Sequence, residues 1–356
     1  MKKLDGKNYN EIGSEFWLED QNGGFCDSGQ AYVLSGRTAI DLILQDMMAV
    51  HSPITSVYMP AWCCDSMLQP FLERGVDIDF YDVSYECDHL AYHIDLDRQP
   101  DILYVNNYFG YSNTLDVGAI RLFKSRGCKI LYDRTHSLFL QDDDILKLAD
   151  YTFASIRKWM GVLCGASLSK DGGEIDMCHL QDYPYLQDKI DAMRLKADYI
   201  NGCGEVDKQS FLDLYASFGH HLVGDYRNYK MDDQSKHLWL CADKDGIKNK
   251  RRANAATLQS GLQEVTQITQ MFSMQDGDTP LFVPVLLHNK EERDALRRHL
   301  TANAVYCPIH WPKPSSIRET MAVNSLYDRE LSLICDQRYG FNEMQRMIEI
   351  IKEYYH

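Results

Sequence analysis

The chain has 356 residues, of which 45% are hydrophobic and 25% charged, an ordinary composition for a folded protein long enough to form two domains. Its formal net charge of -15 disfavours nucleic acids and anionic membranes as partners. The 11 cysteines include no CxxC pair, no apolar run reaches the length of a membrane span, and the first residues lack a signal-peptide core. We therefore expect reduced thiols and a cytoplasmic protein that binds no nucleic acid, membrane or metal.

Short apolar runs alternate with amphipathic helical patterns from about residue 30 to residue 170. The runs that predict strands are 31–34, 57–59, 78–83, 102–105, 129–132 and 151–154. Helices are predicted between them over about 40–48, 66–74 and 115–126. This alternation is typical of a mostly parallel sheet covered by helices, in which ligands bind at the carboxyl ends of the strands.

The second half of the chain predicts more helix and a smaller α/β unit. Residues 174–225 have a mixed, largely helical pattern broken at Gly202 and Gly204, and residues 249–272 predict one long helix. The later predicted elements are strands at 281–287, 305–309 and 331–335 and helices at 290–302 and 342–355. We expect a large domain over residues 1–248, including an N-terminal segment 1–30, and a small C-terminal domain over 249–356.

Two sites in the predicted sheet have residues that suit ligand binding. The sequence SGRT, residues 35–38, stands between a strand and a helix, where free N–H groups and the helix dipole favour an anion. Asp133 ends a strand and His136 follows three residues later. The alternatives are a common turn or cap for SGRT, a helix cap for Asp133 and a structural role, which is usual for a lone histidine, for His136.

Lys158 stands close behind another strand end, in the sequence ASIRKWMGV. Partial burial lowers the pKa of a lysine and makes its amine a nucleophile, although a snorkelling surface lysine is the alternative. Considered together, the three features match the needs of pyridoxal phosphate (PLP). Lys158 would form the Schiff base, Asp133 would pair with the pyridine nitrogen, and Ser155 with the SGRT helix end would hold the phosphate.

At this set of residues the sequence resembles the fold-type-I, PLP-dependent aminotransferases of the DegT/StrS-like family, many of which aminate nucleotide-linked keto sugars. The likeness extends over most of the chain. The segments that carry it are SGRTAIDLIL, VYMPAWCCDSML, VNNYFGY, LYDRTHSL, ASIRKW, RNYKMDD, CPIHWP and LICDQRY. The resemblance implies an α/β fold with a large, mostly parallel, seven-stranded-type sheet domain flanked by helices, and a small C-terminal α/β domain.

The resemblance also implies roles for individual residues. Lys158 and Asp133 are the implied catalytic pair. The implied cofactor-binding set is Gly36, Thr38, Ala39, Trp62, Cys64, Asp133, His136, Ser155, Lys158 and Asn228. Candidate substrate residues, each with a structural alternative, are Arg157, Tyr229, Lys230, His310 and Arg338. Where many members have an aromatic side chain on the cofactor, this chain has Cys64, with Trp62 two residues earlier, so the sequence leaves open which of them covers the ring.

The function implied by the resemblance is transfer of an amino group from an amino-acid donor, with glutamate suggested, to a keto sugar. The sugar would be nucleotide-linked, and the pathway would make polysaccharide or glycan precursors. Asn228 would reach the cofactor phosphate of a second subunit, which implies a homodimer.

Three other functions remain to be weighed against this one. A PLP-dependent sugar dehydratase is one, although that branch of the family uses histidine where this chain has Lys158. A non-catalytic regulatory protein with the same fold is another. A dinucleotide-binding oxidoreductase is disfavoured because no GxGxxG sequence follows a predicted strand.

Overall fold

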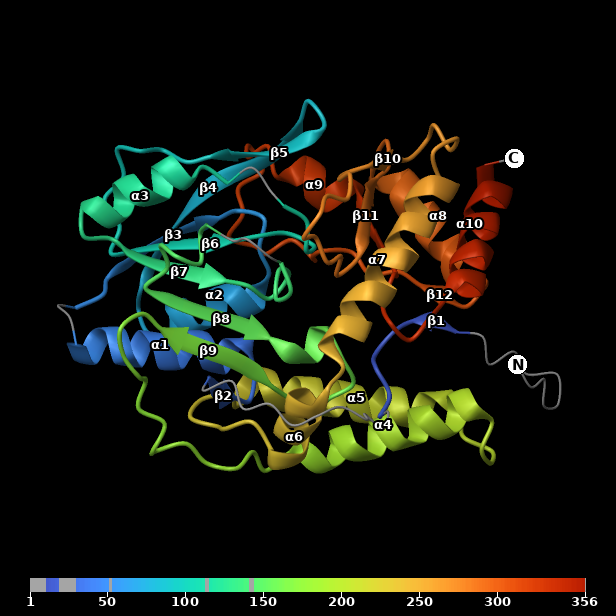
Figure 1. Ribbon diagram of the computed structural model, residues 1–356, viewed down its shortest axis with the longest axis horizontal. Helices are drawn as coiled ribbons and strands as arrows, with labels where there is room; N and C mark the ends of the chain where they lie inside the picture. Colours follow the sequence, from blue (N-terminus) through green and yellow to red (C-terminus); the bar gives the residue numbers. More distant parts are fainter. Residues whose placement is uncertain (1–10, 19–29, 51–52, 113–114, 141–143, 356) are drawn as a thin grey trace.

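The computed structural model describes residues 11–18, 30–50, 53–112, 115–140 and 144–355, so most of the predicted N-terminal segment 1–30 lies outside the described residues. A unit built on a large sheet and a smaller unit lie side by side, and helix α7 (Lys244–Gly261) leads from the first to the second (Figure 1). None of the described helices combines the length and the apolar character needed to cross a membrane.

Eight strands form the large sheet. Their spatial order is β2 (Ala31–Val33), β9 (Ala166–Lys170), β8 (Tyr151–Ser155), β7 (Lys129–Asp133), β6 (Ile102–Asn106), β3 (Ser56–Pro60), β4 (Asp77–Glu86) and β5 (His89–His93). Strands β8, β7, β6, β3 and β4 are parallel, and β9, β2 and β5 pair antiparallel to their neighbours. The predicted α/β class is confirmed, and the β4–β5 hairpin adds an eighth strand to the sheet that was expected.

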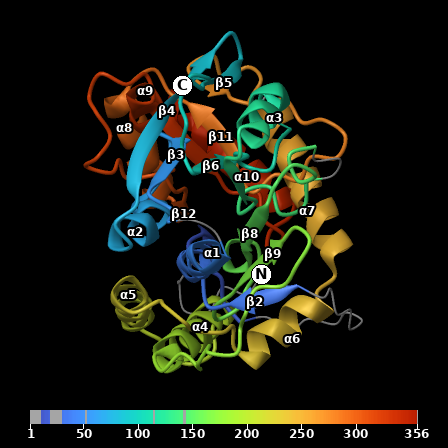
Figure 2. The ribbon, with the colours of Figure 1, turned by 90° about the vertical axis from the view of Figure 1, so that its left-hand side faces the viewer.

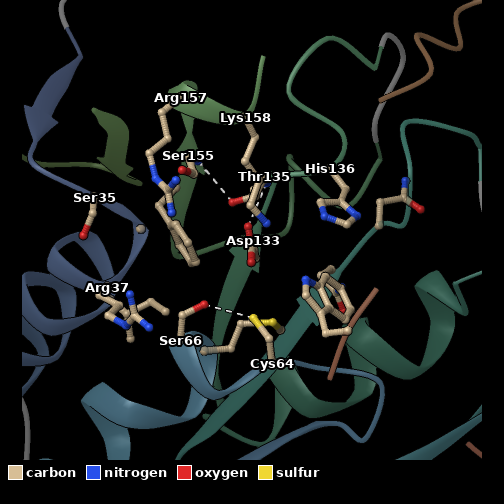
Figure 3. A pocket seen from close by; sticks show the side chains of 17 residues that line it. Ser35, Arg37, Cys64, Ser66, Asp133, Thr135, His136, Ser155, Arg157 and Lys158 are labelled. Carbon is tan, nitrogen blue, oxygen red and sulfur yellow. Dashed lines mark hydrogen bonds between the residues drawn. The ribbon is translucent and has the colours of Figure 1, made fainter. Parts of the chain in front are cut away.

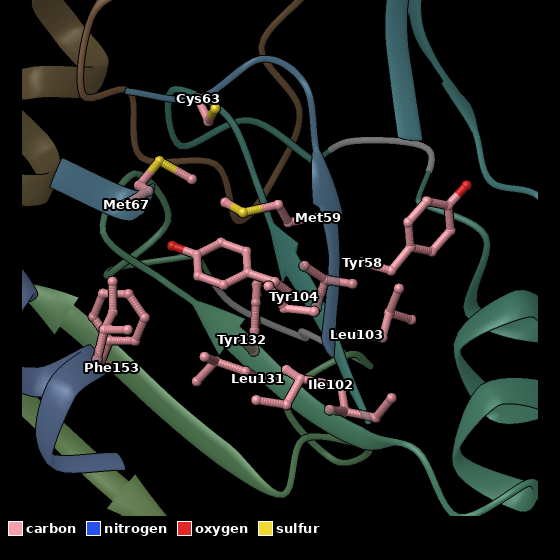
Figure 4. Close-up of a cluster of buried hydrophobic side chains, with 14 of the residues drawn as sticks. Tyr58, Met59, Cys63, Met67, Ile102, Leu103, Tyr104, Leu131, Tyr132 and Phe153 are labelled. Atoms are coloured by element: carbon pink, nitrogen blue, oxygen red, sulfur yellow. The ribbon is translucent and has the colours of Figure 1, made fainter. Parts of the chain in front are cut away.

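The central strands are buried because helices cover both faces of the sheet. Every residue of β6 is buried, as are four of the five in β7. Figure 4 shows part of this core, including Met59 of β3, Tyr104 of β6 and Tyr132 of β7. The helices that connect the parallel strands include α1 (Gly36–Val50), α2 (Asp65–Glu73) and α3 (Val117–Ser125).

Helices α4 (Leu186–Asn201) and α5 (Lys208–Gly224) pack together at the bottom of both ribbon views, and α6 (Asp233–Cys241) lies beside them (Figures 1 and 2). Helix α4 ends at Gly202, whose φ of 67° places it in the left-handed region that glycine adopts without strain. The sequence predicted helix with a break at this residue.

The smaller unit has its own hydrophobic core. Its three-stranded antiparallel sheet contains β10 (Thr269–Gln270), β11 (Val283–Leu286) and β13 (Glu330–Leu333). Its helices are α8 (Lys290–Ala302), α9 (Asn324–Arg329) and α10 (Phe341–Tyr355). Strand β12 (Val305–Tyr306) pairs in parallel with β1 (Ile12–Gly13), so a segment from the start of the chain joins this unit.

The helix predicted over residues 249–272 begins earlier and ends earlier. Asp243 caps α7 by accepting a hydrogen bond of 2.9 Å from the Gly246 N–H, which starts the helix at Lys244, and the helix ends at Gly261. The predicted domain boundary between residues 248 and 249 falls inside α7 and stays a prediction. Ile12, on the large-domain side of that boundary in sequence, packs into the core of the smaller unit.

Candidate active site

The carboxyl ends of the parallel strands and the N-terminus of α1 enclose a pocket with an empty volume of about 560 Å³ (Figure 3). Carboxyl ends of neighbouring parallel strands meet at one edge of the sheet, and β6 and β7 are in register there through Asn106 and Asp133. The pocket is lined by Ser35, Gly36, Arg37, Ile40, Cys64, Ser66, Met67, Asn106, Asn107, Asp133, Thr135, His136, Phe153, Ser155, Arg157, Lys158 and Trp311.

Lys158 is placed by a single turn of 3-10 helix, η1 (Ile156–Lys158), that follows β8. Its amine lies 5.8 Å from the centroid of the Trp311 ring, and among the described residues it has neither a hydrogen bond nor an ion pair. Burial lowers the pKa of this amine, although the nearby Cys64 and Asp133 oppose the shift. Lys158 is therefore an amine prepared to act as a nucleophile or a base.

Asp133 lies at the end of β7 and is 7% exposed. Its Oδ2 accepts a hydrogen bond of 2.7 Å from the Tyr104 hydroxyl, and its Oδ1 accepts one of 2.7 Å from the Thr135 N–H. Burial raises the pKa of this carboxyl, while those hydrogen bonds and the charge of Lys158 act against the rise. A buried carboxylate with these contacts is suited to pair with a protonated ring nitrogen.

His136 packs beside the same space. Its Nε2 is buried without a hydrogen-bond partner, and its ring centroid lies 5.2 Å from that of Trp311. Burial, together with the charge of Lys158, lowers the pKa of His136 well below its usual value of 6.5. The imidazole is therefore neutral near pH 7 and offers a flat surface to a ring in the pocket.

The start of α1 forms the anion-binding side of the pocket. Ser35 precedes the helix, and its carbonyl accepts the first intrahelical bond, 2.9 Å from the Ala39 N–H, so the N–H groups of Gly36 and Arg37 come before that bond. The Nε atoms of Arg37 and Arg157 are both buried and have no hydrogen-bond partner within the described part of the chain. Burial and the like charge of Arg157 lower the pKa of Arg37. A bound anion would offset the repulsion between the two arginines and accept hydrogen bonds from them.

The structure brings together most of the predicted cofactor residues in this pocket. They are Gly36, Cys64, Asp133, His136, Ser155 and Lys158, and Arg157 of the predicted substrate set joins them. Thr38 and Ala39 do not line it: the Thr38 hydroxyl donates to the Tyr226 carbonyl at 2.7 Å, and the Ala39 N–H is used inside the helix. Because α1 begins at Gly36, the exposed amides lie two positions earlier than expected.

The structure separates Trp62 from Cys64. Trp62 is fully buried behind the pocket and donates its Nε1–H to the His310 carbonyl at 2.7 Å, so it does not line the pocket. Cys64 lines the pocket with its Sγ 2.9 Å from the Ser66 hydroxyl. Aromatic surface in the pocket comes instead from Phe153 of β8 and from Trp311, in the CPIHWP segment.

Three further predicted residues, all from the RNYKMDD segment, also lie outside both cavities that this chain forms around Lys158. Asn228 is exposed, with a φ of 59°, and its Oδ1 accepts a hydrogen bond of 2.9 Å from Gln45. The Tyr229 hydroxyl donates to an Asp225 carboxylate oxygen at 2.8 Å, and Lys230 pairs with Asp182 at 3.1 Å.

A larger cavity, with an empty volume of about 1270 Å³, adjoins the first through Arg157 and Lys158. The predicted substrate residues His310 and Arg338 line it, as does Glu15 of the N-terminal segment. Arg338, however, is already paired with Asp336 through hydrogen bonds of 2.9 and 2.8 Å. Arg338 is therefore a part of the cavity wall whose charge is already paired with a carboxylate.

Among the lining residues that sequence reasoning missed, three bear most directly on the chemistry of the site. Arg37 stood in the SGRT motif but was not singled out, and Trp311 directly follows His310. Thr135 links the strand ends, because its N–H contacts Asp133 and its hydroxyl accepts the Ser155 N–H at 3.1 Å (Figure 3). Their position one or two residues from predicted site residues was the available signal.

The fold and the lysine–aspartate pocket have the form of a fold-type-I transferase. Residues 216–334 match the profile of the DegT/DnrJ/EryC1/StrS aminotransferase family, so the resemblance inferred from the sequence is confirmed. No curated protein matches the chain.

Solved structures share the fold over most of the chain. The aminotransferase TlmJ from Streptoalloteichus hindustanus is 17% identical, with a TM-score of 0.61 over 91% of this chain and 85% of its own. The sugar aminotransferase CalS13 from Micromonospora echinospora is 15% identical, with a TM-score of 0.60 over 91% and 87%. NtdA from Bacillus subtilis, solved with bound cofactor PMP, is 16% identical, with a TM-score of 0.62 over 91% and 72%.

Proposed function

We propose that the chain is a PLP-dependent aminotransferase that moves an amino group from glutamate to a nucleotide-linked keto sugar, in the synthesis of polysaccharide or glycan precursors. The observation that carries the proposal is the pocket itself, where an unpaired lysine, a buried aspartate and two unpaired arginines meet at the strand ends. The family match and the aminotransferases that share the fold support it.

The residues present fit PLP. Asp133 lies where a protonated pyridine nitrogen would satisfy its buried carboxylate, and His136 and Trp311 offer ring surfaces. The N–H groups of Gly36 and Arg37 and the buried Nε atoms of Arg37 and Arg157 suit a phosphate. Bound PLP would supply an aldehyde for the Lys158 amine and a protonated ring that withdraws electrons from the substrate carbon.

The chain's own residues would then perform the proton transfers. Because burial lowers the pKa of Lys158, a larger fraction of its amine is neutral near pH 7 and able to take a proton from the substrate carbon. Asp133 would hold the positive charge of the ring in place during the reaction. The wall formed by Trp311 and His136 would limit the access of water to the reacting carbon.

The experiment that tests the proposal is a half-reaction. Purified protein saturated with PLP should have a visible absorbance band that glutamate discharges with release of 2-oxoglutarate, and a nucleotide-linked keto sugar should restore it. Protein that binds PLP but neither discharges it with glutamate nor exchanges the glutamate α-proton would favour a regulatory role. Removal of oxygen from the sugar without amino transfer would favour the dehydratase.

The proposal includes a homodimer. Asn228 lies outside the pocket of its own chain, on an exposed turn beside α1, where a second subunit could receive it. Lys158→Ala and Asn228→Asp variants, each weakened alone, should recover part of the activity when mixed, because one site of the mixed dimer is then intact. A fully active monomer in sedimentation would contradict this arrangement.

A further inference from the structure

A buried line of three polar side chains reaches the larger cavity from the smaller unit. His310 lines that cavity, and Glu330 and Ser332 of β13 lie behind it. Their exposed fractions are 7%, 1% and 0%, respectively. Burial of a carboxyl group is energetically unfavourable unless its hydrogen bonds compensate for the lost water. The aminotransferase chemistry proposed above makes no use of Glu330.

The three side chains are joined by short hydrogen bonds. The Oε2 atom of Glu330 accepts the backbone N–H of His310 at 2.6 Å, and Oε1 lies 2.5 Å from the Ser332 hydroxyl. That hydroxyl lies 2.8 Å from Nδ1 of His310. Since Nδ1 is occupied, Nε2 is the ring nitrogen that remains for a ligand in the cavity.

No cation pairs with the Glu330 carboxyl within the described part of the chain. The nearest, Arg293 of α8, donates to the main-chain carbonyls of Tyr327 and Glu330 at 3.1 and 3.2 Å, and its Nε pairs with Asp294. The titratable and charged groups around the carboxyl and the imidazole include Arg293, Asp294, Cys307, Lys158 and His136, and Arg157 and Arg297 line the same cavity as His310.

These surroundings keep both groups neutral near pH 7. Burial raises the pKa of Glu330 to about 8, which outweighs the hydrogen bonds from Ser332 and His310 and the charge of Arg293. Burial, followed by the charge of Lys158, lowers the pKa of His310 well below 6.5. Near pH 7 the carboxyl group is therefore protonated, and the imidazole carries a single hydrogen on one of its two ring nitrogens.

The direction of the hydrogen bonds then depends on one proton. A protonated Glu330 must carry it on Oε1, because Oε2 already accepts the backbone N–H, and it then donates to Ser332. Ser332 in turn donates to Nδ1, which leaves the ring hydrogen on Nε2. When Glu330 is ionised, Ser332 donates to the carboxylate, Nδ1–H donates to Ser332, and Nε2 becomes an acceptor.

We propose that Glu330, acting through Ser332, fixes the tautomer of His310 so that its Nε2–H donates a hydrogen bond to a carboxylate or carbonyl oxygen of the substrate in the larger cavity. Glu330 and Ser332 are then positioning residues, and His310 is the residue that contacts the substrate. The identity of that substrate rests on the proposed function. The relay, by which the hydrogen bonds from Glu330 through Ser332 set the tautomer of His310, does not.

The tautomer can be read directly from ¹⁵N chemical shifts in PLP-saturated protein labelled at histidine, with His310→Gln used to assign the signals. From pH 6.5 to 9 the His310 ring should change from Nε2–H to Nδ1–H with a midpoint near 8. Glu330→Gln, whose amide donates to Ser332 at every pH, should hold the Nε2–H form throughout, and Ser332→Ala should abolish the transition. A wild-type ring that keeps one tautomer, or the same transition in Glu330→Gln, would overturn the relay.

Binding of glutamate tests the contact with substrate. Its apparent Kd should weaken about tenfold more between pH 7 and 9 in the wild type than in Glu330→Gln, the expected effect of losing one hydrogen bond to a charged group. Equal weakening in the two proteins would overturn the contact. If glutamate fails to discharge the cofactor at any pH, the proposed function fails, while the NMR result still decides the relay.

Discussion

The two cavities around Lys158 differ in how their arginines are satisfied. In the cofactor pocket, Arg37 and Arg157, the latter shared with the larger cavity, have buried Nε atoms without hydrogen-bond partners among the described residues. On the wall of the larger cavity, Arg251 donates to the carbonyls of Trp159, Pro280 and Leu281, and Arg338 pairs with Asp336. An unsatisfied buried cation costs stability and so indicates a place that a ligand completes, whereas a satisfied one indicates a framework.

The largest effect should follow from removing the unpaired lysine. Lys158→Ala should reduce amino transfer by about a thousandfold or more, because both the attachment point of PLP and the base are lost, and the visible absorbance band should disappear. Lys189 is a matched control, since burial lowers the pKa of its amine too, but it pairs with Glu15 at 3.2 Å. Lys189→Ala should lower thermal stability and leave the absorbance band. Loss of the band in this variant would contradict the distinction between the unpaired Lys158 as the reactive lysine and the paired Lys189 as a structural one.

Asp133 should come next in size of effect. Asp133→Asn keeps the shape of the side chain but removes the charge that would hold the ring proton, so the rate should fall about 10²–10³-fold while PLP still binds. Tyr104→Phe removes only the hydrogen bond of 2.7 Å to Oδ2 and should cost about tenfold. Single-turnover rates with glutamate measure both, and equal losses would show that the charge of Asp133 is not what matters.

The arginines can be compared directly by substitution with methionine. Arg37→Met should weaken PLP binding about 10–100-fold, leave binding of pyridoxal without phosphate unchanged, and not reduce the free energy of unfolding of the cofactor-free protein. Arg251→Met should instead lower that free energy by about 1–3 kcal/mol, because buried carbonyls lose their donors. Equal destabilisation by the two variants would remove the distinction between ligand-binding and framework arginines.

The smallest effect concerns the N-terminal segment at the rim of the larger cavity. Lys189 in particular lowers the pKa of Glu15 to about 2, from an ordinary value of 4.5, despite the opposing effect of burial. The folded state thus favours ionised Glu15, so this stabilisation is present above pH 4.5 and disappears as the pH falls toward 2.

Glu15→Gln should therefore be less stable than the wild type at pH 6, and the difference should disappear as the pH falls from 4.5 toward 2. The side chain is 49% exposed, so we expect less than about 1 kcal/mol. Denaturant melts at several pH values measure it, and a difference that persists at pH 2 would argue against the ion pair.

Local pattern sufficed for the parallel strands of the large sheet and for the residues near their ends. Asp133 directly follows an apolar run, Lys158 stands a few residues behind another, and a parallel sheet necessarily gathers such positions at one edge. Strands β5 and β9 were missed because their sequences, HLAYH and ASLSK, are short and mix polar with apolar residues. The end of α7 was also missed, although Gly261, its last residue, is of a type that often marks the end of a helix.

Pairings that depend on how the chain folds around a side chain could not be predicted. Arg338 has the same side chain as Arg37, but its pairing with Asp336 depends on the turn after β13, and the isolation of Arg37 depends on the packing around α1. Thr38 and Ala39 were displaced by two positions because a cap such as Ser35 fixes the first turn of a helix only once the strand before it is placed.

The pairing of β1 with β12 has a consequence for how the chain acquires its structure. Ile12 fills the core of a unit whose other strands and helices lie beyond residue 243, so that core closes only when segments about 300 residues apart meet. Such a contact forms late, and a fragment that begins at α7 would expose both the edge of β12 and the apolar site of Ile12. The smaller unit is thus completed by the first described strand of the chain.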